Sequence, residues 1–236
     1  NYVAESEILD NAEYLIVLGG DGTILQRAAE CAKRKIPVLG INLGKIGFMT
    51  EIEIDDMEDA ISKFLQDDFT IEKRMMMKAE IRKENKIQCS FHALNDVVVS
   101  KVAGEKLIYM ELSTDGVAVN RYTADGLIIA TPTGSTGYSI SAGGPVVDPC
   151  MRLYVATPIC AHMLSVRSAV LSSNKDIRIK LDGEYGNADA VVTADGDIQG
   201  YIKNADEVII TESEYDFELI KIGEQSFYDT LIKKLS

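Results

Sequence analysis

The feature that most constrains the fold is an apolar run that breaks into glycines at Gly19-Gly20-Asp21-Gly22-Thr23 and then resumes at helical spacing. Residues 14–18 lack polar alternation, which predicts a strand buried on both faces of a parallel sheet. Apolar side chains at helical spacing from Ile24 to Ala32 predict a helix that begins near Thr23. The pattern therefore predicts a strand, a tight loop and a helix, as at the start of an α/β domain.

A helix that starts after glycines offers N–H groups and the positive end of its dipole, which suit a phosphate. We therefore expect phosphate contacts at Gly19, Gly20, Gly22 and Thr23. Asp21 is the only acid in the turn, and no lysine follows it as in a Walker-type loop, so the acid is the candidate working side chain. The alternative is an ordinary turn, because Asp-Gly is a common turn pair. The run resembles the loop shared by NAD kinases, diacylglycerol and sphingosine kinases and phosphofructokinases.

The net charge and the cysteine content limit which kinds of partner the protein can bind and in which cellular compartment it is expected. A formal net charge of −13 argues against nucleic acid or an anionic membrane surface as the main partner, because both require clustered cations. The cysteines at positions 31, 89, 150 and 160 form no close pair and no metal-binding spacing, which indicates reduced thiols in a cytoplasmic protein. No apolar run approaches the length of a membrane span, and no signal peptide is visible.

The order of patterns along the chain predicts two domains. Residues 36–41 read as a second buried strand, which completes a β-α-β unit, and residues 55–66 read as a helix with Asp55 as its N-cap and Leu65 on its buried face. From about Phe69 the period becomes alternating, with Asp-Gly turns at 115, 125, 182 and 195, as in a β-sandwich. Residues 226–235 return to helical spacing. We expect an α/β domain of residues 1–72 and 212–236, Rossmann-like and phosphofructokinase-like, and a β-rich, sandwich-like domain of residues 73–211.

A second glycine-rich stretch, residues 125–145, runs from an apolar strand into a loop dense in hydroxyl groups and then into a short helix. Such a loop offers hydrogen bonds to a polar, flat or sugar-like ligand. The run resembles the Asp-Gly-Leu…Thr-Pro-Thr-Gly-Ser-Thr-Ala-Tyr…Ser-Ala-Gly-Gly-Pro pattern of NAD kinases. Four further segments also resemble motifs of that family and occur in the same order: residues 42–48, 93–97, 158–167 and 195–196. The resemblance covers almost the whole chain from Val17 onward.

The departures from the family pattern are few. Asp96 replaces the usual Glu, Gly137 replaces Ala, and Ala161 and Ser168 replace prolines. The chain begins at Asn1 rather than Met, and the family's first strand and helix are not recognised in it. We therefore expect sequence to be missing at the amino end.

The resemblance implies phosphorylation of the 2′-hydroxyl on the adenosine ribose of NAD, which gives NADP, with ATP or polyphosphate as donor and Mg²⁺ or another divalent cation as cofactor. Asp21 is the candidate proton acceptor and a possible Mg²⁺ contact. The resemblance also implies a homotetramer or homodimer. The residues that it assigns to NAD binding are Gly22, Phe48 as an apolar wall, Asn95 and Asp96 at a ribose, Asp125 at the carboxamide, Thr133, Thr136, Tyr138, Ser141 and His162.

Several alternatives stay open at this point. A core position for His162 is as plausible as a ligand contact, and Arg167 suits either a phosphate or an ion pair. A diacylglycerol-type lipid kinase would explain the first loop but not the second glycine-rich stretch. A catalytically silent NAD-binding sensor would keep the pocket without turnover, although the retention of Asp21 and of both glycine runs favours an enzyme. The preference for donor, for NAD or NADH, and any feedback by NADPH are left undecided.

Overall fold

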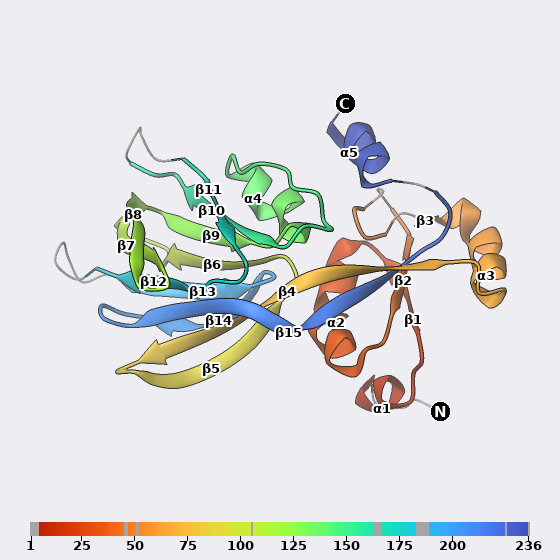
Figure 1. The fold of residues 1–236 in the computed structure, drawn as a ribbon, viewed down its shortest axis with the longest axis horizontal. Coiled ribbons are helices and arrows are strands. Elements are labelled where there is room, and N and C mark those ends of the chain that lie inside the picture. Colours follow the sequence, from red (N-terminus) through yellow and green to blue (C-terminus); the bar gives the residue numbers. More distant parts are fainter. Residues whose placement is uncertain are drawn as a thin grey trace. The chain divides into compact units, whose positions relative to one another are not determined.

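A computed structural model describes residues 5–44, 47–50, 52–104, 106–162, 167–182, 189–224 and 226–235 (Figure 1). The chain divides into two compact units. The first, which we call the α/β unit, comprises Asn1–Arg74 and Tyr215–Ser236, and the second, the β-rich unit, comprises Met75–Glu214. The strands β4 (Thr70–Lys83) and β15 (Glu207–Lys221) each run from one unit into the other.

The α/β unit is built on parallel strands. β1 pairs with β2 from Leu15↔Val38 to Gly19↔Asn42, and β2 also pairs in parallel with β3 and, at Leu219↔Val38, with β15. The elements of this unit are α1 (Glu5–Asp10), β1 (Leu15–Gly19), α2 (Asp21–Arg34), β2 (Val38–Asn42), β3 (Ile52–Glu53), the 3₁₀ turn η1 (Ile54–Asp56), α3 (Met57–Leu65) and α5 (Phe227–Leu235).

The predicted strand, loop and helix around the first glycine run are confirmed, with one shift. α2 buries Ile24, Ala28, Cys31 and Ala32, the face that the helical spacing indicated. The helix begins at Asp21 rather than near Thr23, because Gly20 adopts an extended conformation and serves as its N-cap. This shift places the carboxylate in the first turn of the helix.

Two local predictions in this unit are wrong. β1 is not buried on both faces: Val17 is buried, but Ile16 and Leu18 are 41% and 54% exposed, since β1 lies at the end of its strand order. Asp55 is not the N-cap of α3, because the 3₁₀ turn η1 precedes the helix and Asp56 occupies that position. Leu65, expected on the buried face, is 75% exposed.

The β-rich unit contains two layers of strands around one core. One layer is a six-stranded sheet in the order β11-β10-β9-β6-β13-β14, and in the other β12 pairs with β7 and β15, β7 with β8, and β4 with β5. Buried residues of both layers, among them Val97, Leu127, Met110 and Ile177, form one hydrophobic cluster. The further elements are β5 (Lys86–Ala93), β6 (Asp96–Lys101), β7 (Ile108–Thr114), β8 (Val117–Ala124), β9 (Gly126–Ala130), η2 (Thr133–Thr136), α4 (Tyr138–Ser141), β10 (Leu153–Ile159), β11 (Ala169–Ser172), β12 (Ile177–Leu181), β13 (Ala190–Ala194) and β14 (Asp197–Ile202).

Two of the four predicted Asp-Gly turns of this unit are found where expected: Asp115 and Asp195 have positive φ in the hairpins β7–β8 and β13–β14. A further turn, between β4 and β5, has positive φ at Glu84 and Asn85. Asp125-Gly126 is not a turn, because Gly126 begins β9 and pairs with Ser100. Gly183 lies outside the described residues.

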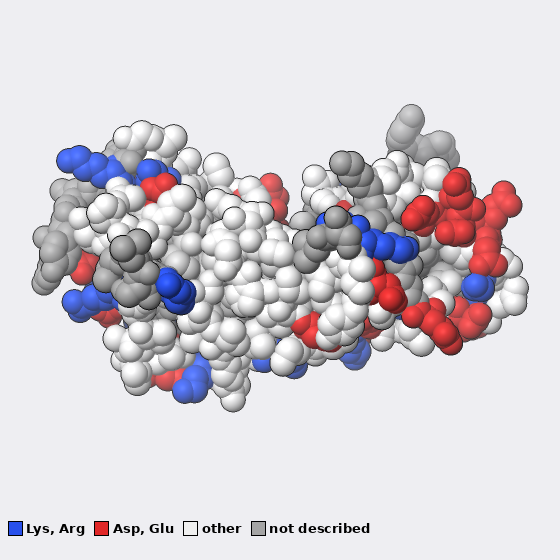
Figure 2. Space-filling model, turned by 90° about the horizontal axis from the view of Figure 1, so that it is seen from above, with Lys and Arg blue, Asp and Glu red and all other residues white. Residues whose placement is uncertain are grey.

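Charge is unevenly distributed over the surface. Figure 2 shows acidic side chains gathered over the segment around α3, where Glu53, Asp55, Asp56, Glu58 and Asp59 are exposed. Such a face does not attract the phosphates of nucleic acid. Within the part of the chain that the structure describes, no helix is both long and apolar enough to cross a membrane.

Candidate active site

The Asp21 side chain is held by the loop Gly47–Thr50, which follows β2. Its Oδ2 accepts a hydrogen bond from the Phe48 N–H at 2.8 Å. Its Oδ1 accepts from the N–H groups of Met49 and Thr50 and from the Thr50 hydroxyl, each at 3.1 Å. The loop itself is tight, since the Gly47 N–H donates to the Thr50 carbonyl at 3.2 Å. Four donors from one short loop therefore fix the orientation of this carboxylate.

The glycines around Asp21 have two different roles. A Cβ at Gly47 would lie 2.0 Å from Asp21 Oδ1, and one at Gly19 would lie 2.5 Å from Thr23 Oγ1, so both positions require close packing without a side chain. A Cβ at Gly20 or Gly22 would meet nothing within 4 Å. The backbone at these two positions is thus open to a ligand.

The two oxygens of Asp21 differ in what they can still accept. A carboxylate has about four acceptor positions, two on each oxygen. Oδ1 already receives three donors, whereas Oδ2 receives one. Oδ2 is therefore the atom that can take a further hydrogen bond, a proton or a metal ion.

The Phe48 side chain, predicted to form an apolar wall for NAD, contacts α5. Its ring centroid lies 5.7 Å from that of Phe227, and Lys234 Nζ lies 4.4 Å from its centroid. Phe48 is half-buried, so part of the ring remains accessible.

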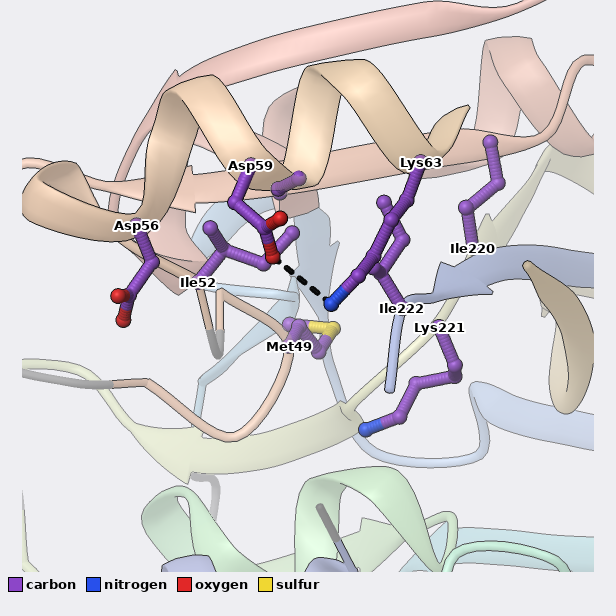
Figure 3. A pocket seen from close by; sticks show the side chains of 10 residues that line it. Met49, Ile52, Asp56, Asp59, Lys63, Ile220, Lys221 and Ile222 are labelled. Atoms are coloured by element: carbon purple, nitrogen blue, oxygen red, sulfur yellow. Dashed lines mark ion pairs between the residues drawn. The ribbon is translucent and has the colours of Figure 1, made fainter. Parts of the chain in front are cut away.

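A pocket of about 120 Å³ adjoins this loop at Met49 (Figure 3). It is lined mainly by β2, α3 and the end of β15, and Lys63 Nζ on its rim pairs with Asp59 Oδ2 at 2.7 Å. Pockets for nucleotide-sized ligands usually measure about 300–1,000 Å³. This pocket does not include Asp21 and is too small for a nucleotide.

In the β-rich unit the predicted ribose residues Asn95 and Asp96 lie in a turn that Asp195 organises. The Asp195 carboxylate accepts hydrogen bonds from the N–H groups of Leu94 and Asn95 at 2.8 Å and of Asp96 at 3.1 Å. These bonds connect residues about one hundred positions apart in the sequence. The hairpin β13–β14 thus fixes the backbone that presents the Asn95 and Asp96 side chains.

Burial changes the protonation of this pair of acids. Burial and, as a smaller cause, the negative charge of Asp195 together raise the pKa of Asp96 to about 7. Burial also raises the pKa of Asp195, although its three backbone donors act against this shift. Asp96 therefore carries a proton for part of the time at neutral pH, so that it is able to donate as well as to accept a hydrogen bond.

The hydroxyl-rich loop packs directly on this turn. The Thr131 hydroxyl donates to the Leu94 carbonyl at 2.5 Å and accepts from the Gly134 N–H at 3.1 Å. A Cβ at Gly134 would lie 2.0 Å from the Asn95 carbonyl oxygen, so only glycine allows this approach. Asn95 Oδ1 is a buried side-chain oxygen without a hydrogen-bond partner in the described structure, which leaves it available to a ligand.

The other predicted residues of this loop lie next to the same turn. Thr133 is buried, and its carbonyl accepts a hydrogen bond from the Thr136 hydroxyl at 3.2 Å. Tyr138 and Ser141 are exposed on the short helix α4. A Cβ at Gly137 would lie 3.3 Å from the Gly134 carbonyl oxygen and 3.5 Å from Asn95 Nδ2, so an alanine here would require a shift of a few tenths of an ångström.

Asp125 and His162 lie elsewhere in this unit. Asp125 precedes β9, whereas Thr133 follows its other end, and five residues of strand span roughly 17 Å. Lys101 Nζ pairs with Asp125 Oδ1 at 2.6 Å. His162 is exposed rather than in the core, and its N–H donates to the Thr123 carbonyl. Arg167 is exposed. The structure therefore separates these residues from the cluster of Asn95, Asp96 and the hydroxyl-rich loop.

Sequence reasoning missed two residues that the geometry makes important. Thr50 gives Asp21 two of its four donors, and it follows directly after the loop of residues 42–48 that the family motif covers. The sequence indicated Asp195 as part of a turn and of a family motif. No local signal in the sequence indicated that its carboxylate accepts hydrogen bonds from the backbone of Asn95 and Asp96.

A metal site built from protein side chains alone is not found in the described ranges, which contain no group of three or more His, Cys, Asp or Glu residues in ligating arrangement. Mg²⁺ commonly binds through one or two carboxylates and the phosphates of a substrate. Asp21 Oδ2, with its remaining acceptor position, fits the protein part of such a site.

Comparisons with known proteins identify the family of the chain. The model of the ATP-NAD kinase N-terminal domain matches residues 1–69, and that of the C-terminal domain matches residues 94–222. The NAD kinase of Natranaerobius thermophilus is 42% identical over 95% of this chain and 78% of its own length. That of Geobacter sulfurreducens is 38% identical over 95% of this chain and 78% of its length.

Two solved structures have the same fold. Yeast NADH kinase complexed with NADH matches with a TM-score of 0.87 and 28% identity, over 98% of this chain and 67% of that one. An NAD kinase from Archaeoglobus fulgidus in complex with ATP matches with a TM-score of 0.77 and 30% identity, over 97% and 85%. These matches confirm the expected fold class and support neither the lipid-kinase nor the silent-sensor alternative. The chain belongs to the NAD kinase family, the phosphotransferases that make NADP.

Proposed function

We propose that the protein transfers the terminal phosphoryl group of ATP to the 2′-hydroxyl of the adenosine ribose of NAD, with Asp21 as the proton acceptor. The observation that carries this proposal is the fixed Asp21 carboxylate, whose Oδ2 retains an acceptor position beside the open backbone of Gly20 and Gly22. A secondary hydroxyl is a poor nucleophile, so catalysis depends on positioning, charge neutralisation and proton removal.

Within this proposal the residues of the site have separate tasks. Asp21 Oδ2 receives the proton of the 2′-hydroxyl as its oxygen attacks the terminal phosphorus of ATP. The bond from that phosphorus to the bridging oxygen breaks and ADP leaves, while Asp21 Oδ1 stays bound to the loop donors. The end of β1 and the N-terminal turn of α2 bind donor phosphates at Gly19, Gly20, Gly22 and Thr23. A Mg²⁺ ion on the donor phosphates would supply neutralisation of the developing negative charge, and Asp21 Oδ2 would be its ligand only while that oxygen is not receiving the substrate proton.

The β-rich unit is the proposed NAD-binding part. Asn95 Oδ1 is a free acceptor and Asp96 is able to donate or accept, which suits the neighbouring hydroxyls of a ribose. Thr133, Thr136, Tyr138 and Ser141 add hydroxyl groups next to this turn. Asp125, Phe48 and His162 complete the proposed contacts to NAD. A dimeric or tetrameric assembly and a cytoplasmic location also belong to the proposal, and the four cysteines, all of them free, suit a reducing compartment.

The experiment that tests the proposal measures NADP(H) formation with donor and acceptor varied independently: ATP or polyphosphate, NAD or NADH, with and without Mg²⁺. General-base catalysis typically contributes about 10²–10⁴-fold, so Asp21→Asn should lower kcat by about this factor with ATP and NAD. Turnover of Asp21→Asn at the parent rate would refute the assignment of Asp21.

A further inference from the structure

The loop that holds Asp21 is itself held by the helix α5. The backbone N–H of Phe48 donates to Asp21 Oδ2 at 2.8 Å, whereas the ring of the same residue packs on Phe227 and under Lys234 Nζ. One residue therefore connects the carboxylate to a helix about two hundred positions later in the chain. We call these contacts of Phe48 with Phe227 and Lys234 the α5 clamp.

α5 has a well-fixed start, which makes it able to hold the loop. The Ser226 N–H and hydroxyl donate to Asp229 Oδ2 at 3.0 and 2.7 Å, and the Asp229 N–H donates back to the Ser226 hydroxyl at 3.2 Å. These reciprocal bonds cap the helix, and they lower the pKa of Asp229. Thr230, one turn after Phe227 begins the helix, is fully buried. The helix is thus docked by its first turn, the turn that carries Phe227.

The Asp21 carboxylate cannot turn unless the loop moves. Its Oδ1 would lie only 2.0 Å from a Cβ at Gly47, and the fully buried Thr50 donates to the same oxygen from its N–H and its hydroxyl. Displacement of Phe48 would remove the donor from Oδ2, the oxygen that receives the substrate proton in the proposed function. The position of this oxygen accordingly depends on the ring contacts of Phe48.

We propose that Phe227 and Lys234 are positioning residues for the catalytic carboxylate: through the ring of Phe48 they fix the loop 47–50, and through its N–H they fix Oδ2 of Asp21. This inference rests on the proposed role of Asp21. It differs from a purely structural role of α5, in which loss of the contacts would lower thermal stability without changing kcat of the folded enzyme.

The chain offers matched variants for the test. Lys234→Ala removes the cation above the ring, and Lys233→Ala removes an exposed neighbouring cation of the same helix. Phe227→Leu removes the aromatic contact, and Phe227→Tyr retains a ring. Aromatic pairs and exposed cation–π contacts stabilise an arrangement by about 2- to 12-fold and about 2- to 5-fold, respectively. We expect kcat to fall by up to these factors for Phe227→Leu and Lys234→Ala, with KM for NAD and ATP unchanged and Lys233→Ala and Phe227→Tyr near the parent.

Two further measurements separate this inference from the proposed function. In the Asp21→Asn background, Phe227→Leu should have no further effect on the residual kcat, because its effect acts through the carboxylate. Hydrogen exchange of the Phe48, Met49 and Thr50 amides should become faster in Phe227→Leu and Lys234→Ala but not in Lys233→Ala. Unchanged exchange, or an undiminished loss of kcat in the Asp21→Asn background, would overturn the clamp. If Asp21→Asn kept full activity while Phe227→Leu and Lys234→Ala still showed faster amide exchange, the proposed role of Asp21 would be refuted but the contacts of the α5 clamp would stand.

Discussion

Asp21 and Asp195 are held in almost the same way and yet serve different purposes. Each accepts hydrogen bonds from three consecutive backbone N–H groups of a distant loop, at residues 48–50 for Asp21 and at 94–96 for Asp195. Asp21 stands beside open glycine backbone, whereas Asp195 stands beside a second acid, Asp96. In both cases the backbone donors fix the carboxylate, and in the proposed function the space around its remaining acceptor position decides whether it takes part in the reaction or only supports a turn.

The largest expected effect concerns the acid beside Asp195. Because the pKa of Asp96 is raised to about 7 in the folded protein, the folded state keeps this proton to higher pH than the unfolded state does. The free energy of unfolding should therefore fall as the pH rises from about 4 to about 7, by about 4 kcal/mol for roughly three pKa units. Urea unfolding of the parent and of Asp96→Asn at several pH values checks this. Asp96→Asn should lose most of the slope, with the remainder from Asp195, whose pKa is also raised, and the control Glu53→Gln, at an exposed acid of the α/β unit, should keep the parent slope. Equal slopes in all three proteins would contradict the assignment.

The loop around Asp21 allows a test with two glycines. Gly47→Ala would place a Cβ 2.0 Å from Asp21 Oδ1 and must displace the carboxylate or the loop. A displacement of about 1 Å at a catalytic group can cost about 100-fold, so we expect kcat to fall by about this factor. Gly44→Ala is the control, because its Cβ would have its nearest contact at 3.9 Å, with Asn42 Oδ1. Similar steady-state rates for both variants would show that the loop tolerates the displacement.

Asp195 should affect stability and binding rather than the chemical step. Asp195→Asn replaces one of the two oxygens by an amide NH₂ group, which then faces at least one of the three N–H donors, and an unsatisfied buried donor costs about 1–3 kcal/mol. We expect the free energy of unfolding to fall by about this amount and KM for NAD to rise, while kcat at saturating NAD stays near the parent. A variant of Asp195 that lost kcat as Asp21→Asn does would remove the distinction between the two carboxylates.

The smallest expected effect concerns the Thr50 hydroxyl, which donates a hydrogen bond to Asp21 in addition to the three backbone N–H groups. Thr50→Val removes one of three donors to Oδ1 but leaves the backbone bonds in place, so kcat should fall by about tenfold, the value of one hydrogen bond to a charged group. Thr50→Ser should restore the rate, because it keeps the hydroxyl. Thr70→Val, at an exposed threonine of the same unit, serves as the control in the same assay.

Sequence reasoning predicted best where the signal is local. The run Gly19–Thr23 indicated strand, loop and helix, and the Asp-Gly pairs at 115 and 195 predicted hairpins, because these conformations depend on neighbouring residues. It failed where the answer depends on distant partners. The residue pattern of β1 does not show that this strand lies at the edge of its sheet. The residues near Asp195 do not show that its carboxylate binds a turn about one hundred residues earlier.

The candidate site shows the same limit. Motifs indicated Asp21, Asn95 and Asp96 as candidates. They could not indicate Thr50 or the ring contacts of Phe48 with α5, since hydrogen bonds and packing between remote segments leave no spacing to recognise. Asp125 lies at the start of β9, and His162 follows the end of the antiparallel strand β10 that pairs with that start. The hydroxyl-rich loop follows the other end of β9, which the order of these residues in the chain does not reveal.

The α/β unit is assembled from two stretches of chain that the whole β-rich unit interrupts, and this order has a consequence for synthesis on the ribosome. Strand β2 emerges early but meets Leu219 of β15 only after every strand of the β-rich unit has been translated. The parallel sheet of the α/β unit therefore remains incomplete, with β2 lacking its β15 partner, while the β-rich unit is translated. The contact of α5 with Phe48, in the loop that holds Asp21, forms later still.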